Sequence, residues 1–321
     1  MSLTASNTDH TTLPEDYRPR FSFRFFSPRN WPAWLLMAAL GLGVLLPRPV
    51  SGFLGACMGD LFRLGSKKRR HIVDVNLQLC FPEMAADQRD QLARRHFRIH
   101  GQCLLDMGLI WWARKQFLER YIQIEGLEHY RAALDSGHNV ILLTGHFSAL
   151  DIAGPAISRY YPQVGLIKPI RNEVGDYLMA YGRRRFNGKV YLRDKGMRSI
   201  VKAINAGYGF YYLPDEDFGP EKSIFVPFLG TESATITALN KLAKLTNARV
   251  LPTSVRRLSA KEGYRIVIQP ALPDFPSDNA EADAVRMNRS LADMVADAPE
   301  QYMWTFKYFR TRPNGEPSPY D

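Results

Sequence analysis

The sequence predicts an α/β fold with a mixed, largely parallel sheet flanked by helices, preceded by an N-terminal membrane-anchoring helix. From Tyr121 onward, short apolar runs alternate with helix-like segments, which is typical of strands and helices packed around one sheet. Near the N-terminus, Trp31–Leu46 carries no charge. The chain has 321 residues, 45% of them hydrophobic, which is enough for a sizeable core.

The polar segment 1–30 is followed by a hydrophobic region over 31–63. Its uncharged run is slightly shorter than the roughly 20 residues of an ideal membrane span. Trp31 and Trp34 stand where an interfacial aromatic belt would lie, and the run begins too late for a cleaved signal peptide. We expect a single membrane anchor or a tightly bound interfacial helix, with a buried core helix as the alternative. Arginine and lysine flank the region on both sides, so the charges do not orient it.

The residues from 64 to 312 are expected to form one α/β domain. Apolar spacing predicts a long helix over 86–112 and an amphipathic helix over 281–297. The expected strands are Val140–Leu143, Val164–Ile167, Val190–Leu192, Phe210–Leu213, Ile224–Phe228, Val250–Val255 and Arg265–Ile268. The expected helices between them cover 150–160, 174–186, 196–206 and 234–246. The tail, 313–321, contains proline and glycine and is predicted to be loose.

The chain carries an excess of positive charge and few cysteines. Its 42 Lys+Arg against 32 Asp+Glu give a formal net charge of +10. Such an excess favours anionic partners: membrane lipid, phosphorylated substrates, acidic proteins or nucleic acid. Cys57, Cys80 and Cys103 form no CxxC pair, so their spacing predicts neither a disulfide framework nor a zinc site. We expect three reduced, buried thiols.

The stretch TGHFSALDIAG, residues 144–154, places His146 and Asp151 where a strand gives way to a helix. Ligands gather at the carboxyl ends of strands in such sheets. Residues five apart in one helix are rotated by about 140°, so the two side chains can meet only if His146 precedes the helix. A carboxylate on one ring nitrogen raises the basicity of the other. The pair is a candidate general base, and helix capping is the alternative.

Two further polar clusters are candidates for binding. The segment YGRRRFNGK places four cations together: Arg183, Arg184, Arg185 and Lys189. Guanidinium groups bind phosphates well, and a solvated basic face is the alternative. The segment YYLPDEDFGP carries three carboxylates directly after an expected strand: Asp215, Glu216 and Asp217. Acidic residues at strand ends ligate metals or orient donors, and a plain acidic turn explains the composition equally well.

Several common enzyme signatures are absent from the sequence. There is no GxSxG nucleophile elbow and no GxxxxGK[ST] phosphate loop. The segment GLGVLL, residues 41–46, lies in the hydrophobic region and fails the last position of GxGxxG. His96 and His100 have the spacing of a helical metal pair but no evident third ligand, so we expect a solvated helix face and no metal site.

His146 and Asp151 match the H-x4-D/E signature of glycerolipid-type acyltransferases. Further segments resemble the late (secondary) acyltransferases of lipid A biosynthesis: VNLQLCFPE, GHFSALDIAG, YGRRRFNGK, LPDEDFGPEKSIFVPFLG and APEQYMWTFKYFRTRP. The resemblance extends from the hydrophobic region to the tail. The H-x4-D pattern alone is weakly specific, whereas its combination with the acidic segment and the PEQYMW segment, in this order, is strong.

The resemblance implies transfer of a fatty acyl chain from acyl carrier protein to a hydroxyl of a 3-hydroxyacyl chain on a Kdo-containing lipid A precursor. It implies a place at the inner membrane, with the catalytic domain facing the cytoplasm. His146 would remove the proton of the acceptor hydroxyl. Asp151, which is Glu in many relatives, would orient the His146 ring. Arg183 would contact phosphate or substrate, and Asp215 would hold the site together. No cofactor is implied, because a thioester is already activated.

Three other functions compete with this interpretation. An acyltransferase for glycerol phosphate or lysophosphatidate shares H-x4-D, but it would not predict the PEQYMW-type C-terminus. A non-catalytic, membrane-associated binding protein would not need the intact pair of His146 and Asp151. A nucleic-acid binder is unsupported by any recognition motif, and the hydrophobic region argues against it. The length of the acyl chain and the acceptor position stay open at this point.

Overall fold

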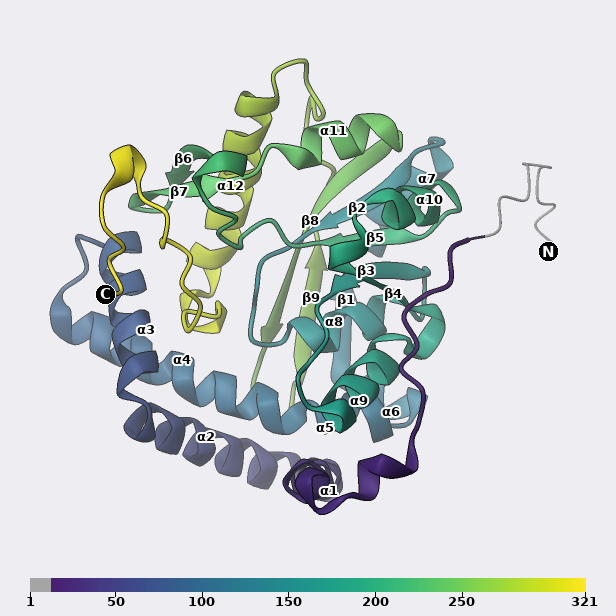
Figure 1. The fold of residues 1–321 in the computed structure, drawn as a ribbon, viewed down its shortest axis with the longest axis vertical. Helices are drawn as coiled ribbons and strands as arrows, with labels where there is room; N and C mark the ends of the chain where they lie inside the picture. The colour runs from purple at the N-terminus through teal and green to yellow at the C-terminus, as the bar shows by residue number, and fades with distance from the viewer. Residues whose placement is uncertain (1–12) are drawn as a thin grey trace.

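The centre of the molecule is a seven-stranded sheet with the strand order β1-β9-β8-β2-β5-β3-β4. The computed structural model describes residues 13–321, without the side chain of Lys195 (Figure 1). Neighbouring strands run parallel except for the antiparallel pair β8 and β9. The predicted α/β fold with a mixed, largely parallel sheet is therefore confirmed. The strands of this sheet are β1 Ile122–Glu125, β2 Asn139–Leu143, β3 Gln163–Ile167, β4 Lys189–Leu192, β5 Gly209–Tyr212, β8 Ala248–Arg257 and β9 Tyr264–Ile268.

Two further strands form an antiparallel hairpin apart from the main sheet, β6 (Ile224–Phe228) and β7 (Thr231–Thr235). Each apolar run predicted as a strand is present. The pattern does not single out β1 or β7, and β7 reads TESAT, which is too polar to be recognised as an apolar run. The helices that alternate with the strands are α7 Leu127–Asp135, α8 Leu150–Ile157, α9 Glu173–Arg183, α10 Arg198–Asn205, α11 Ala238–Leu245 and α12 Ala280–Asp297.

Strand β2 lies in the interior of the sheet. Val140–Leu143 is at most 1% exposed, and α7 and α10 pack against β2. Burial on both faces explains why β2 is a continuous apolar run rather than an alternating one. The parallel register with β5 places Leu143 opposite Tyr212. The carboxyl ends of β2 and β5 therefore meet at one edge, and the polar segments that follow them share that edge.

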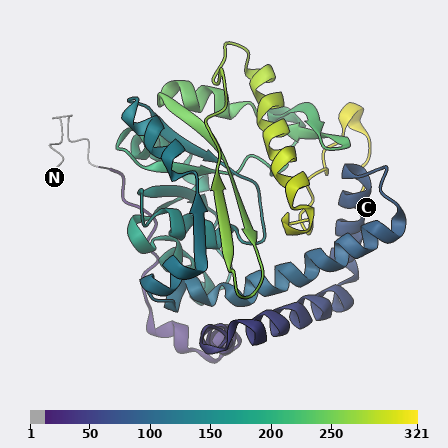
Figure 2. The same ribbon diagram turned by 180° about the vertical axis from the view of Figure 1, so that it is seen from behind.

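A helical layer precedes the sheet in the chain and lies along one side of it (Figures 1 and 2). It consists of α1 Trp31–Leu45, α2 Arg48–Gly65, α3 Lys67–Cys80, α4 Ala86–Asp106, α5 Gly108–Trp112 and α6 Lys115–Tyr121. The long helix predicted over 86–112 is thus divided into α4 and α5 at Met107. Figures 1 and 2 show α2 running beside α4 on the side away from the sheet.

The hydrophobic region predicted over 31–63 forms two helices rather than one anchor. Leu46, between α1 and α2, is extended with φ −70° and ψ 147°, and Pro47 follows it. Proline disfavours helical backbone in the residue before it, so the chain breaks here. In the described part of the chain, no helix is both long enough and apolar enough to cross a membrane. The predicted transmembrane helix is therefore not found in the structure.

The contact between α2 and α4 depends on glycine. A Cβ atom on Gly59 would lie 2.1 Å from the carbonyl oxygen of Phe97. A Cβ atom on Gly101 would lie 2.3 Å from the carbonyl oxygen of Gly55. Real Cβ atoms do not approach so closely, so the two helix backbones are in direct contact. The three glycines hold α2 against the domain at a distance that no other residue allows.

The composition predicted a loose C-terminal tail, but the structure buries the side chain of its penultimate residue, Tyr320. Tyr320 is 6% exposed, and its hydroxyl donates to Asn76 Oδ1 at 2.5 Å and accepts from the Phe309 amide at 3.0 Å. One aromatic side chain with satisfied hydrogen bonds thus anchors a segment whose other residues are proline, glycine and polar residues.

The cysteines are reduced, and two of the three are buried as expected. Cys80 and Cys103 lie in the core, whereas Cys57 on α2 is only partly buried. Burial raises the pKa of the Cys103 thiol to about 12. This thiol is therefore protonated and behaves as a small apolar side chain.

Candidate active site

His146 and Asp215 meet at the edge where β2 and β5 end. His146 Nδ1 donates to Asp215 Oδ1 at 2.7 Å, and the His146 amide donates to Asp215 Oδ2 at 2.6 Å. The hydroxyl of Tyr302 donates to the same Oδ2 at 2.8 Å. The Asp215 side chain is only 4% exposed. Three donors thus hold one buried carboxylate against the imidazole ring.

The electrostatics of this pair favour the charged form of both side chains. Burial by itself lowers the pKa of His146, but the charge of Asp215 and its hydrogen bond outweigh burial and raise the pKa above its ordinary value of 6.5. Burial likewise opposes ionisation of Asp215, yet His146 and the other donors lower its pKa below 3.8. His146 is therefore a stronger base than a free histidine, with Nδ1 occupied and Nε2 available.

Gly145 permits the close approach of the turn to Asp215. A Cβ atom here would lie 3.0 Å from the Tyr302 ring and 3.2 Å from Asp215 Oδ2. A larger residue would push the carboxylate away from the His146 amide, which donates to that same oxygen. The glycine before the histidine thus has a steric function rather than a conformational one.

The PEQYMW segment holds the turn that carries His146. The Met303 amide donates to the His146 carbonyl at 2.8 Å, and the Ser148 amide donates to the Gln301 carbonyl at 2.8 Å. Phe147 and Tyr302 form an isolated antiparallel bridge. A C-terminal segment far away in the sequence therefore completes the site, by backbone pairing and through the Tyr302 hydroxyl.

Asp151 has a different partner from the one expected. It lies in the first turn of α8, where its Oδ1 accepts from Arg183 Nε at 2.7 Å. Asp215 occupies the position next to His146 Nδ1, because the register of β2 and β5 places the ends of these two strands side by side. Asp151 still contributes a negative charge that raises the pKa of His146, after Asp215 and Glu216. The four residues predicted from the sequence thus form two adjoining pairs, His146 with Asp215 and Asp151 with Arg183.

The three consecutive carboxylates after β5 have three different partners. Asp215 binds the His146 ring. Asp217 accepts from the Thr311 amide at 2.6 Å and from the Thr311 hydroxyl at 2.8 Å. Glu216 lies 3.8 Å from His146 Nε2 and pairs with Arg193, a residue directly after β4. Sequence reasoning missed Arg193, although its place at the end of a strand was the available signal.

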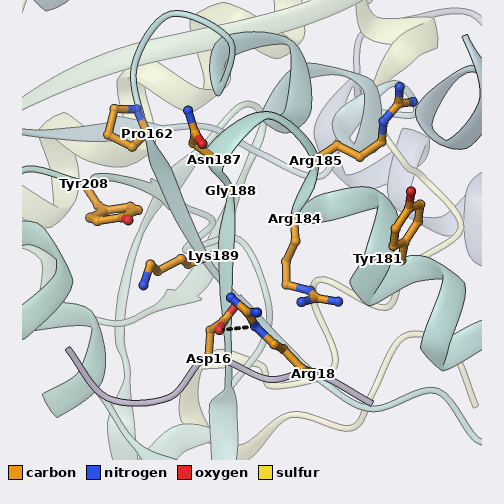
Figure 3. Close-up of a pocket in the computed structure, with 10 residues that line it drawn as sticks. All are labelled: Asp16, Arg18, Pro162, Tyr181, Arg184, Arg185, Asn187, Gly188, Lys189 and Tyr208. Carbon is orange, nitrogen blue, oxygen red and sulfur yellow. Dashed lines mark hydrogen bonds and ion pairs between the residues drawn. The ribbon is translucent and has the colours of Figure 1, made fainter. Parts of the chain in front are cut away.

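The cationic cluster of the YGRRRFNGK segment is divided by the fold (Figure 3). Arg183 goes to Asp151, whereas the guanidinium of Arg185 donates to the backbone carbonyls of Ile110 and of Ala113, the latter at 3.0 Å. Figure 3 shows the Arg185 side chain leading away from Lys189, although Arg184, Arg185 and Lys189 all line one cavity. Of the cluster predicted as one phosphate site, Arg183 is therefore separated by its pairing with Asp151, whereas the other three cations share the lining of one cavity.

That cavity lies at the amino ends of the parallel strands, whereas His146 lies at their carboxyl ends. It has a volume of about 770 Å³, and its lining includes Arg18, Arg184 and Lys189. Pro162, Lys189 and Tyr208, which also line it, stand at or just before the amino ends of β3, β4 and β5. The candidate active site follows the carboxyl ends of these and neighbouring parallel strands, so the cavity is separate from it.

The sequence predicted that His96 and His100 lie on a solvated helix face, and this prediction is wrong. His96 packs beneath the C-terminal segment, and His100 is partly buried. His96 is fully buried, and its Nδ1 donates to the Glu300 carbonyl at 3.2 Å. Burial lowers the pKa of His96 to about 3 and that of His100 to about 4, so both are neutral. Over residues 13–321 no group of three His, Cys, Asp or Glu side chains could hold a metal ion.

Comparison with known proteins identifies the family of this chain. Residues 18–311 match the family model described as bacterial lipid A biosynthesis acyltransferase. The chain belongs to this family. It is 35% identical to the lipid A biosynthesis lauroyltransferase of Escherichia coli (strain K12), over 94% of this chain and 99% of the relative. It is 33% identical to the myristoyltransferase of the same organism, over 95% of each. The protein is thus a secondary acyltransferase of lipid A biosynthesis, which excludes the non-catalytic alternative.

Two further matches complete the comparison. The lipid A biosynthesis palmitoleoyltransferase of Escherichia coli (strain K12) is 33% identical over 94% of this chain and 98% of the relative. The crystal structure of the 1-acyl-sn-glycerophosphate acyltransferase from Thermotoga maritima aligns with 73% of this chain and 99% of that chain. Its TM-score is 0.36, with 13% sequence identity.

Proposed function

We propose that this acyltransferase moves a fatty acyl chain from acyl carrier protein to a hydroxyl of a 3-hydroxyacyl chain on a Kdo-containing lipid A precursor, with His146 as the general base. The observation that carries the proposal is the bond of 2.7 Å between His146 Nδ1 and the buried Asp215. It fixes the ring so that Nε2 is the nitrogen that can accept a proton.

The proposed reaction is a single acyl exchange between sulfur and oxygen. His146 Nε2 takes the proton of the acceptor hydroxyl while the hydroxyl oxygen attacks the thioester carbonyl carbon. The tetrahedral intermediate then collapses, the C–S bond breaks, and the leaving thiolate takes the proton from His146. An ester and a free thiol result, and His146 returns to its starting form. Because a thioester is already activated, the proposed reaction requires neither a metal nor an organic cofactor.

We assign Asp215 and Asp151 different functions in this reaction. Asp215 orients the His146 ring and stabilises the imidazolium that forms, which is the function expected of Asp151 from the sequence. Asp151 instead holds Arg183 beside the site through the contact of 2.7 Å. With Nε directed to Asp151, the two terminal nitrogens of Arg183 are placed to contact an anionic group of the acceptor.

We further propose that α1, α2 and the segment before them bind the surface of the inner membrane, with the catalytic domain facing the cytoplasm. Large apolar side chains are exposed here, including Phe23 at 87%, Leu45 at 80% and Leu35 at 71%. The preceding segment also carries Arg20, Arg24 and Arg29. Apolar side chains flanked by cations match the chemistry of an anionic lipid surface, which would bring the enzyme to a lipid acceptor.

The proposed base is tested with His146→Ala and the control His71→Ala, which changes an exposed histidine on α3. Both proteins are incubated with acyl carrier protein bearing an acyl chain and with the Kdo-lipid A precursor, and products are identified by mass spectrometry. We expect the first variant to bind membranes normally and to lose acyl transfer, and the control to retain both. Turnover retained in His146→Ala would refute the base. Lipid A from cells with and without the protein would identify the acylated position and the chain length.

A further inference from the structure

Glu216 stands beside the nitrogen of His146 that faces away from Asp215. Its Oε1 is 3.8 Å from Nε2, which is too long for a hydrogen bond. The ring is therefore flanked by two carboxylates, one bonded at Nδ1 and one held just out of bonding range at Nε2. Glu216 would need to move by only about 1 Å to bond the ring, and it would then occupy the place of the acceptor hydroxyl.

The backbone position of Glu216 is set by its two neighbours. Asp215 is held by the His146 ring, the His146 amide and Tyr302. Asp217 is held by the amide and hydroxyl of Thr311, and it also accepts from the Gly219 amide at 2.9 Å. Both flanking carboxylates are fixed, so the backbone of Glu216 is restrained on both sides. The distance from the Glu216 carboxylate to His146 then depends on what binds that carboxylate.

Arg193 binds the carboxylate of Glu216. Its guanidinium pairs with Glu216 Oε2, the carboxylate oxygen other than the one near His146. The guanidinium also lies over the ring of Phe218, with its central carbon 4.6 Å from the ring centroid. Arg193 comes from the end of β4 and Phe218 from the loop after β5, so two elements fix the cation. The Glu216 and Arg193 side chains are 39% and 41% exposed.

We propose that Arg193 and Glu216 form a positioning pair, in which Arg193 restrains Glu216 from bonding His146 Nε2 and so keeps that nitrogen free for the acceptor hydroxyl. The effect on catalysis rests on the proposed function, since it requires His146 to be the base. The effect on the protonation of His146 does not depend on that function, and it can be measured separately.

The charges around the ring explain why such a restraint is needed. Asp215, Glu216 and Asp151 all place negative charge near His146, and each raises its pKa. Arg183 offsets Asp151, and Tyr302 donates to Asp215, so Glu216 depends on Arg193 for its counter-charge. Without Arg193, an unbalanced carboxylate would favour the imidazolium. An imidazolium has no lone pair at Nε2 and cannot accept a proton from the hydroxyl.

The experiment measures the protonation of His146 and the activity in the same proteins. ¹⁵N-histidine NMR of the full chain gives the pKa of each of its seven histidines, and His146→Asn identifies the signal of His146. Activity against pH is measured in parallel. We compare wild type with Arg193→Gln, Glu216→Gln and the double variant. Arg265→Gln is the matched control, because Arg265 is a half-exposed arginine paired with Glu125 away from the site.

We expect Arg193→Gln to raise the pKa of His146 by about one unit. The acid limb of the activity profile should move to higher pH by the same amount. Glu216→Gln should shift both in the opposite direction. The double variant should behave like Glu216→Gln, because Arg193 acts through Glu216. Arg193→Lys, which keeps the charge, should recover most of the wild-type pKa, and Arg265→Gln should not change it.

An unchanged pKa of His146 in Arg193→Gln would overturn the inference. So would a shift that persists in the double variant, because Arg193 would then act by its own charge and not by restraining Glu216. Failure of the proposed function gives a different result, in which the NMR pKa moves as expected but the activity profile does not follow it.

Discussion

His146 Nδ1 bonds Asp215 Oδ1 at 2.7 Å across a separation of 69 residues. The carboxylate five positions away in the same motif, Asp151, is instead bonded to Arg183. The H-x4-D pattern therefore marks two adjoining pairs rather than one dyad. This arrangement separates the orientation of the base from the placement of a cation, and the two effects can be tested independently.

Asp215→Asn should reduce kcat far more than Asp151→Asn. The amide cannot stabilise the imidazolium that forms during the reaction, so we expect a loss of roughly 100- to 10,000-fold. Asp151→Asn keeps the Asp215 bond and should affect mainly KM for the lipid acceptor, through Arg183. Steady-state kinetics of the two variants provide the measurement. An equal or larger loss of kcat in Asp151→Asn would contradict the assignment.

Removing Asp151 should also destabilise the protein by leaving Arg183 without its counter-charge. Asp151→Asn is expected to cost about 1–2 kcal/mol of unfolding free energy, since the pair is only partly exposed. Asp151→Asn combined with Arg183→Gln should cost less than the sum of the single changes. Urea denaturation of the four proteins measures the coupling. Strict additivity would mean that the two side chains do not stabilise each other.

The stability contributed by the His146 and Asp215 pair should depend on pH. The pKa of His146 is raised above 6.5, so its contribution is complete below that value and is lost as pH rises through the folded pKa. The pKa of Asp215 is lowered below 3.8, so its contribution is present above that value and is lost as pH falls through the folded pKa. The difference in Tm between wild type and His146→Gln should therefore be largest near about pH 5 and smaller near about pH 9. A difference that does not vary with pH would contradict this.

The same raised pKa fixes the direction of the activity profile. His146 must be neutral to accept a proton, so kcat/KM should increase with pH through a midpoint above 6.5. The profile is measured at saturating acyl donor with one ionic strength throughout. A midpoint below 6.5 would show that the carboxylates do not control the base.

Gly59→Ala should weaken the attachment of α2 to the domain. The added methyl group would meet the Phe97 carbonyl at 2.1 Å, and such overpacking costs typically about 1–3 kcal/mol. Gly65→Ala is the matched control, because nothing lies within 4 Å of a Cβ atom at that end of the same helix. Thermal unfolding should show a lower Tm for Gly59→Ala only. Equal Tm values for the two variants would contradict the close contact between α2 and α4.

Polar substitution on α1 should weaken membrane binding without affecting the active site. Leu35→Ser combined with Leu45→Ser removes two highly exposed apolar side chains, and we expect about a tenfold loss of affinity for vesicles containing anionic phospholipid. Leu245→Ser on α11 is the control, since Leu245 is 61% exposed but far from this layer in sequence. Sedimentation with vesicles is the measurement. Unchanged binding of the double variant would exclude α1 as a lipid contact.

The sequence by itself determined most of the elements and the family of this protein. Apolar runs such as Val140–Leu143 predicted strands because their hydrophobicity is a local property of a few consecutive residues. The break at Gly145 placed His146 at the carboxyl end of a strand, where α/β sheets gather their ligands. The PEQYMW segment carried the family resemblance. None of these inferences required knowing which strands are neighbours.

Only the tertiary structure decided which side chains meet. The register of β2 and β5 brings Asp215 to His146, and the neighbouring ends of β4 and β5 bring Arg193 to Glu216. The loop after α9 sends adjacent arginines to different partners. Such pairings depend on strand order and on the direction of each turn, which are long-range properties that local periodicity does not contain. The sequence thus located the proposed base, and the packing of distant strands decided which carboxylate bonds its ring.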